Sequence, residues 1–341
     1  MSAELSPVTT TLDFEKAGKQ QGYLRVPHSR NSSAWGAILI PITVVNQGSG
    51  PTVLFVGGSH GGEYEGPVSL MKVSRTLQAE QVQGRVIIIP ALNLPAVLAG
   101  QRLSPIDGKD MNRVFPGLWN GTKTQVIAHY LHEVILPLCD AVIDLHAGGY
   151  SLSLLPYMSM HYLENEEQNQ QTFAAMQAFD APISLVMKEI SGEGLLDYAV
   201  ERMGKIFLCA ELGSAGTLSP QAIKITDVGV HNLLVHFGLI EGEVVTRESQ
   251  GLSPGRLMEV PAPENYHTAM ANGIYESFYE LGDWVEAGEP VGQIHFVENI
   301  AWAPQPIIAQ RSGMLLCTRG PGFVEIGDSV AVVAHDLDPP G

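Results

Sequence analysis

Basic residues, cysteines and long apolar runs are all scarce in this 341-residue sequence. It contains 19 Lys and Arg against 36 Asp and Glu, which gives a formal net charge of −17. Because so acidic a chain repels phosphate and shows no cluster of Lys or Arg, we exclude binding to nucleic acid and to anionic membrane surfaces. No run approaches the ~18 uninterrupted apolar residues of a membrane-spanning helix, so we expect no membrane partner.

The three cysteines, Cys139, Cys209 and Cys317, are odd in number and widely spaced. This pattern argues against a disulfide framework and favours a reducing compartment, with each cysteine a small buried residue in an apolar run. The N-terminal residues MSAELSPVTTTLDFEK lack the basic start and apolar core of a secretory signal. We therefore expect a cytoplasmic location.

Apolar residues make up 45% of the chain, which excludes disorder. The acidic excess is uneven, because residues 246–341 hold 13 acidic residues against 4 basic ones, all of them Arg. At ~100–200 residues per domain, the length suits two domains. We place the boundary near this change in composition, giving domains at 1–250 and 251–341.

The first domain alternates short apolar runs with helical patterns. Residues 22–46 alternate like two antiparallel strands. The further expected strands are 52–57, 85–92, 141–145, 183–187 and 205–211, and the expected helices are 67–77, 124–139, 165–179, 194–203 and 220–237. Continuous apolar strands between helices indicate an α/β fold with a mixed, mostly parallel sheet covered by helices on both faces.

Beyond residue 250 the sequence changes to short β segments divided by Gly and Pro. Residues 273–296 and 313–334 are faintly alike, since each places a Gly-Asp turn before a Val-rich strand. This resembles the pseudo-symmetric barrel-sandwich hybrid of lipoyl and biotinyl domains, and it predicts an all-β C-terminal domain. Such domains carry a modified Lys, and residues 246–341 contain none. We therefore expect a structural or oligomerising domain, and with it a homo-oligomer.

Candidate metal ligands follow several of the expected strands. His60 and Glu63 follow the first apolar run of the α/β domain, His146 follows the third, and Glu211 ends the last. Open α/β sheets bind ligands at the carboxyl ends of their strands. Two histidines and one carboxylate, with a further carboxylate free, form the composition of a catalytic zinc site that keeps an open position for water. The glycines beside His60 and His146 allow the backbone to approach the metal closely.

The segment 93–117 supplies a second group of candidates. It is too rich in Pro, Gly and Asp to be helical throughout, and it contains Arg102 and the pair Asn112-Arg113. Arginine offers a planar fork for a carboxylate and a fixed cation for a developing oxyanion. The sequence therefore predicts a small cationic site in an acidic chain.

Four motifs in order, HGGEYEG, DMNRVFPG, DLHAGG and AELGSAG, resemble the succinylglutamate desuccinylase/aspartoacylase family, whose fold is that of the zinc carboxypeptidases. The resemblance implies one Zn²⁺ per subunit, held by His60, Glu63 and His146, with Glu211 as the catalytic carboxylate. It also implies that Asn112 and Arg113 bind the α-carboxylate of a small N-acyl amino acid, and that the Arg102 guanidinium polarises the scissile carbonyl. Within the family, the sequence is most similar to the branch that deacetylates N-α-acetyl-L-2,4-diaminobutyrate in bacterial ectoine degradation.

Other functions stay open at this point. Deacylation of N-acetyl-aspartate or N-succinyl-glutamate would use the same site. The segment Gly57-Gly58-Ser59-His60-Gly61 also fits the G-x-S-x-G motif of serine hydrolases, which would make Ser59 a nucleophile and would need Asp227 with His231 or His236. A protein that only binds metal or ligand is a third alternative, although it has no need of Glu211.

Two finer assignments are also open. Asp144, two residues before His146, is a candidate partner for that histidine. The side-chain ammonium of a diaminobutyrate substrate needs a polar or acidic acceptor, for which Glu65, Glu164 and Asp197 are candidates that the sequence does not rank.

Overall fold

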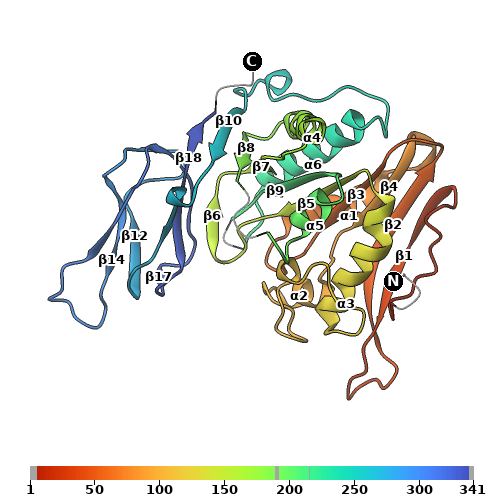
Figure 1. Ribbon diagram of the computed structural model, residues 1–341, viewed down its shortest axis with the longest axis horizontal. Coiled ribbons are helices and arrows are strands. Elements are labelled where there is room, and N and C mark those ends of the chain that lie inside the picture. Colours follow the sequence, from red (N-terminus) through yellow and green to blue (C-terminus); the bar gives the residue numbers. More distant parts are fainter. Residues whose placement is uncertain (1–5, 189–191, 215, 338–341) are drawn as a thin grey trace.

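The computed structural model describes residues 6–188, 192–214 and 216–337. Most of its strands belong to one large mixed sheet, and a smaller antiparallel sheet lies in the C-terminal region (Figure 1). The strands are β1 (Gly18–Pro27), β2 (Ala37–Gln47), β3 (Thr52–Gly57), β4 (Gly84–Ile89), β5 (Ala141–His146), β6 (Leu152–Leu154), β7 (Tyr157–His161), β8 (Ile183–Met187), β9 (Ile206–Glu211), β10 (Arg256–Val260), β11 (Tyr266–Thr268), β12 (Gly273–Ser277), β13 (Trp284–Val285), β14 (Pro290–His295), β15 (Gln305–Ile308), β16 (Gly313–Arg319), β17 (Phe323–Val324) and β18 (Ser329–Asp336). The α-helices are α1 (Glu65–Thr76), α2 (Leu94–Ala99), α3 (Lys123–Tyr130), α4 (Glu166–Phe179), α5 (Leu196–Glu201) and α6 (Pro220–His236).

The apolar runs of the sequence form the middle of the large sheet. The described strands lie in the order β1-β2-β4-β3-β5-β9-β7-β8-β10-β18-β16-β13. β3 is parallel to β4 and β5, and β5 is parallel to β9, whereas β1 and β2 form an antiparallel edge. Alternate residues of β3 enter two cores, since Leu54 and Val56 pack on the side of α3 and α5, while Val53 and Phe55 pack on the side of α1, α4 and α6. The prediction of a mixed sheet with helices on both faces is confirmed. Its parallel pairs are β3 with β4 and β5, β5 with β9, and β8 with β7 and β10, whereas the other described pairs of this sheet are antiparallel.

Two strands in the α/β part of this sheet are not predicted by the sequence. β6 pairs with β16, and β7 is antiparallel to β9 and parallel to β8. In β7 the polar Tyr157, Ser159 and His161 alternate with the buried Met158 and Met160. The strand therefore lacks the continuous apolar run by which the other buried strands are recognised.

The C-terminal region is all-β, as predicted. Its small sheet has the order β15-β14-β12-β17 and shares a core with β13, β16 and β18, which extend the large sheet. The two similar segments exchange strands, because β12 pairs with β17 and β13 pairs with β16. The Gly282 and Gly327 turns both have the positive φ that favours glycine, +97° and +94°. These described strands form two sheets and no closed barrel.

The α/β part and the C-terminal part are joined by hydrogen-bonded strands. β10 is parallel to β8, and β18 is antiparallel to β10, so the large sheet continues past residue 250. The division into domains 1–250 and 251–341 stays a prediction.

The three cysteines lie apart and are free thiols. Cys139 and Cys317 are buried, as predicted, and Cys209 is half-buried in β9. In the part of the chain that the structure describes, no helix is both long and apolar enough to cross a membrane.

Candidate metal centre and active site

The carboxyl ends of β3, β5 and β9 meet at one edge of the sheet. His60 and Glu63 lie in the loop between β3 and α1, while His146 and Glu211 are the last residues of β5 and β9. The parallel register of these two strands places His146 beside Glu211. The fold thus brings together residues from three distant parts of the sequence.

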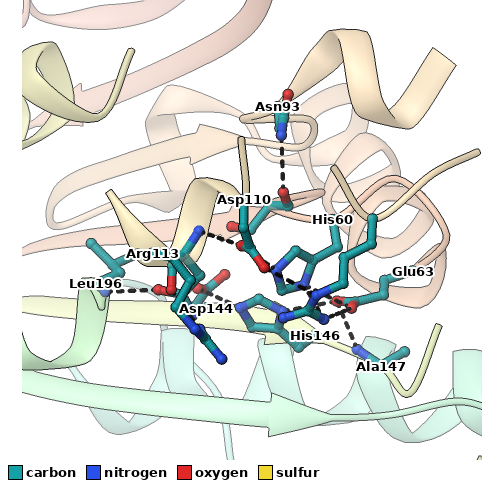
Figure 2. A network of polar contacts seen from close by, with 12 residues as sticks. His60, Glu63, Asn93, Asp110, Arg113, Asp144, His146, Ala147 and Leu196 are labelled. Atoms are coloured by element: carbon teal, nitrogen blue, oxygen red, sulfur yellow. Dashed lines mark hydrogen bonds and ion pairs between the residues drawn. The ribbon is translucent and has the colours of Figure 1, made fainter. Parts of the chain in front are cut away.

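His60, Glu63 and His146 form a buried cluster (Figure 2). The Glu63 carboxylate lies between the rings, with Oε1 2.8 Å from His60 Nδ1 and Oε2 2.8 Å from His146 Nδ1. One ligand atom from each residue lies within 4.8 Å of the others. Two imidazole nitrogens and a carboxylate oxygen are the protein ligands of several three-ligand catalytic zinc sites.

The other ring nitrogens of both histidines contact carboxylates. His60 Nε2 lies 3.0 Å from Asp110 Oδ1, and His146 Nε2 lies 2.7 Å from Asp144 Oδ2. A carboxylate on the second nitrogen fixes the orientation of a metal-ligating ring and makes its first nitrogen a better ligand. The cluster therefore fits a divalent cation in its ligands and in their supports. Asp144 is the partner suggested by the sequence, whereas Asp110 is not predicted.

Electrostatics keep the Glu63 carboxylate charged. Burial opposes its charge, but His60 and His146 outweigh burial and lower the pKa of Glu63 to about 2. Burial likewise opposes the charge of Asp110, and contacts with His60 and Arg102 lower the pKa of that carboxyl well below its usual range. Charged oxygens are the form in which both residues can bind or support a cation.

Glu211 differs from the other carboxylates of the site. Burial, and then the nearby charge of Glu63, raise its pKa to about 7. Its Oε2 is buried and has no hydrogen-bond partner among the described residues. A carboxylate with a pKa near neutrality and an unpaired oxygen is suited to accept and return a proton.

The segment between α2 and α3 places Arg102, Asn112 and Arg113, all predicted from the sequence, near the His60–Glu63–His146 cluster. Arg102 Nε donates to Asp110 Oδ2 at 3.0 Å, and its Nη1 lies 3.9 Å from Glu63 Oε1. The backbone N–H of Asn112 donates to Asp110 Oδ1 at 2.9 Å. Arg113 Nη1 donates to the Asn112 carbonyl at 2.6 Å. Asp110 therefore connects a histidine of the cluster to both parts of this loop.

Two cavities meet at the cluster. The first, about 280 Å³, is lined by all seven residues proposed from the sequence: His60, Glu63, Arg102, Asn112, Arg113, His146 and Glu211. The second, about 370 Å³, shares His60, Glu63 and Arg102 with the first and continues along the 148–151 loop. Asn112 and Arg113 line the first cavity and are not among the residues of the second.

Comparison with known proteins identifies the family. Residues 49–237 match the succinylglutamate desuccinylase/aspartoacylase catalytic domain. The sequence is also 43% identical, over 98% of this chain and 96% of the relative, to the N-alpha-acetyl-L-2,4-diaminobutyric acid deacetylase of Halomonas elongata. The chain belongs to the succinylglutamate desuccinylase/aspartoacylase family.

Solved structures of the family have the same fold over nearly the whole chain. A succinylglutamate desuccinylase/aspartoacylase from Rhodobacter sphaeroides has a TM-score of 0.93 and 43% identity, covering 98% of this chain and 100% of its own. The product-bound ectoine utilization protein EutE (DoeB) from Ruegeria pomeroyi has a TM-score of 0.92 and 38% identity, covering 97% and 99%. The resemblance drawn from the four motifs is thereby confirmed.

Gly61 of the first family motif is required by a close backbone approach. A Cβ at this position would lie 1.8 Å from the carbonyl oxygen of Ala96, and the Gly61 N–H donates to the Gln101 carbonyl at 2.8 Å. This contact sets the loop before Arg102 against the loop that carries His60. The glycine expected to let the backbone approach a metal thus joins two loops of the site.

The serine-hydrolase alternative has no support in the family or in the geometry. Ser59 is only 2% exposed. Asp227, which that alternative needs, lies on α6 and accepts hydrogen bonds from Ser69 Oγ and Lys72 Nζ, each at 2.6 Å. The structure does not bring the expected triad together.

Proposed function

We propose that this protein is a zinc-dependent deacylase that hydrolyses N-α-acetyl-L-2,4-diaminobutyrate to L-2,4-diaminobutyrate and acetate. The observation that carries the proposal is the buried His60–Glu63–His146 cluster beside Glu211, in a chain 43% identical to a deacetylase of that substrate. The EutE (DoeB) protein, described as an ectoine utilization protein, supports the same substrate class.

In this proposal His60, Glu63 and His146 hold one Zn²⁺ per subunit. When bound there, zinc supplies Lewis-acid chemistry, which polarises carbonyls and makes water more acidic. Asp110 and Asp144 keep the two rings turned toward the cation, as their contacts with the Nε2 atoms suggest.

The remaining residues bind the substrate and move its proton. Asn112 and Arg113 hold the α-carboxylate, because both line the first cavity and one offers a carboxamide and the other a guanidinium. Arg102, which lines both cavities, stabilises the negative charge that develops on the acyl oxygen. Glu211 takes a proton from the attacking water and gives it to the leaving nitrogen as the amide bond breaks.

The test combines metal analysis with a panel of N-acyl amino acids. We expect about one zinc per chain, loss of activity with chelators, and the highest kcat/KM for N-α-acetyl-L-2,4-diaminobutyrate. Faster turnover of N-acetyl-aspartate or N-succinyl-glutamate would refute the proposed substrate assignment but would be consistent with the proposed zinc-dependent amide hydrolysis. The cytoplasmic location and the homo-oligomer stay predictions, which cell fractionation and light scattering can test.

A further inference from the structure

The first cavity extends from the His60–Glu63–His146 cluster along two strands. On β9 it is lined by Phe207, Cys209 and Glu211, and on β7 by Tyr157, Ser159 and His161. Residues two apart on a strand face the same side, so these side chains form one polar and apolar floor. Arg113, Leu195 and Asp197 also line the cavity and come from outside the sheet. If Asn112 and Arg113 bind the α-carboxylate, the amino-acid side chain lies in this part of the cavity.

Three carboxylates line the cavity among the described residues: Glu63, Glu211 and Asp197. The first is a proposed metal ligand and the second the proposed base, so Asp197 is the described carboxylate of this cavity that has no proposed role so far; its Oδ1 accepts a hydrogen bond from the Tyr198 N–H. The other two candidates from the sequence do not line the cavity. Glu65 is 1% exposed and lies against Gly213, and Glu164 is exposed on the surface.

The segment that carries Asp197 is fixed to the loop that carries the carboxylate-binding residues. Asn112 Oδ1 accepts a hydrogen bond from the Leu196 N–H at 2.8 Å, as Figure 2 shows near the label of Leu196. The Phe115 N–H donates to the Gly194 carbonyl at 3.0 Å. The same contacts thus set the position of Asn112 and that of the first turn of α5. Asp197 and the α-carboxylate site are held as one unit.

The spacing along β9 suits a short side chain. α5 packs on β9, and Asp197 lines the same cavity as Cys209 and Glu211 of that strand. Two residues of a strand span roughly 7 Å. In 2,4-diaminobutyrate four bonds separate the two nitrogens, so they lie about 5 Å apart when extended. A side chain of this length, starting from an α-nitrogen at Glu211, therefore extends within the cavity that Asp197 lines.

We infer that Asp197 is the specificity-determining residue that binds the side-chain ammonium of the substrate, an inference that rests on the proposed function. The cavity is also lined by Lys188 and His161. His161 is paired with Glu201 at 3.0 Å, and Lys188 is exposed where β8 ends. An acidic substrate side chain would bind Lys188 instead. Whether the enzyme prefers a cationic or an anionic substrate side chain therefore distinguishes binding at Asp197 from binding at Lys188.

The test is the Asp197→Asn variant of the zinc-loaded enzyme, assayed on two substrates. N-α-acetyl-L-2,4-diaminobutyrate has the ammonium, and N-acetyl-L-2-aminobutyrate has the same carbon skeleton without it. Loss of a hydrogen bond between charged groups lowers kcat/KM by about 10- to 100-fold. We expect kcat/KM for the first substrate to fall by that factor, chiefly through KM, and kcat/KM for the second to change less than twofold. Glu164→Gln is the matched control and should change neither.

Each other result overturns the inference. An equal loss on both substrates assigns Asp197 a structural role, and a wild-type preference for N-acetyl-aspartate assigns the cavity to an acidic side chain. If the wild type hydrolyses no N-acyl amino acid, the proposed function fails as well. Should the variant not fold, product inhibition of the wild type gives the answer. L-2,4-diaminobutyrate should then bind at least tenfold more tightly than L-2-aminobutyrate, and equal binding refutes the inference.

Discussion

The Asp110 carboxylate offers a sharp test of how the site is held together. Asp110 receives three contacts, from His60 Nε2, from the Asn112 N–H and from Arg102 Nε. In Asp110→Asn, one oxygen can still face His60 and Asn112, but the new NH₂ group then meets the Arg102 donor. A hydrogen bond between charged groups is worth about 1.5–3 kcal/mol. Because Arg102 is 48% exposed, we take the lower end, which corresponds to about a tenfold loss in kcat.

The matched variant is Asp144→Asn, because Asp144 contacts only His146 among the site residues, through Oδ2. Loss of a carboxylate behind a metal-ligating histidine costs about 10- to 100-fold in metal affinity or activity. Competition with a chelating dye should therefore show weaker zinc binding in both variants. At saturating zinc, kcat should recover in Asp144→Asn and stay reduced in Asp110→Asn. If both variants recover fully, Arg102 does not depend on Asp110 and the reasoning is wrong.

Three further variants test other parts of the structure. Glu211→Gln should lower kcat by at least about 100-fold with zinc still bound. Because burial raises the pKa of Glu211 to about 7, the contribution of this residue to the stability of the metal-free wild type is fully present below about pH 4.5 and is lost as the pH rises through 7. With both proteins metal-free, the thermal stability of the variant relative to the wild type should therefore increase between about pH 4.5 and pH 7. Ser59→Ala should keep activity within a few fold, and its inactivation would restore the serine-hydrolase alternative. Gly229→Ala places a Cβ 2.3 Å from the buried ring of Phe179, so urea denaturation should show a loss of about 1–3 kcal/mol with KM unchanged.

Strands that are apolar on both faces can be recognised in the sequence, and so can the candidate site residues at their carboxyl ends. Val53 to Val56 and Ala141 to Leu145 are fully buried, which is why continuous apolar runs predicted β3 and β5. His146 and Glu211 could be predicted because they follow such runs at the carboxyl edge, where a parallel sheet gathers its ligands.

The residues that the sequence does not predict depend on long-range contacts. Strand β7 is not recognised in the sequence because Tyr157, Ser159 and His161 make the face toward the cavity polar. Its pairing with β8 and β9 is what defines it as a strand. Asp110 is not predicted because its role depends on a contact with His60, which lies 50 residues away in the sequence. The D-x-N-R spacing before Arg113 is the feature of the sequence that could have indicated it. Asp197 could be named but not ranked, since ranking it requires the cavity.

Strand β6 makes the C-terminal region a neighbour of the first cavity. Leu152, Ser153 and Leu154 pair with Arg319, Thr318 and Cys317 of β16, and the Gly320 N–H donates to the Ser151 carbonyl at 2.9 Å. Ser151 and Leu152 line the first cavity. A fragment cut after the family match at residue 237 would keep every proposed catalytic side chain, yet it would lose the strand that supports one wall of the cavity. We therefore expect such a fragment to be inactive although it carries all four motifs, because the acidic C-terminal strands support the wall formed by Ser151 and Leu152.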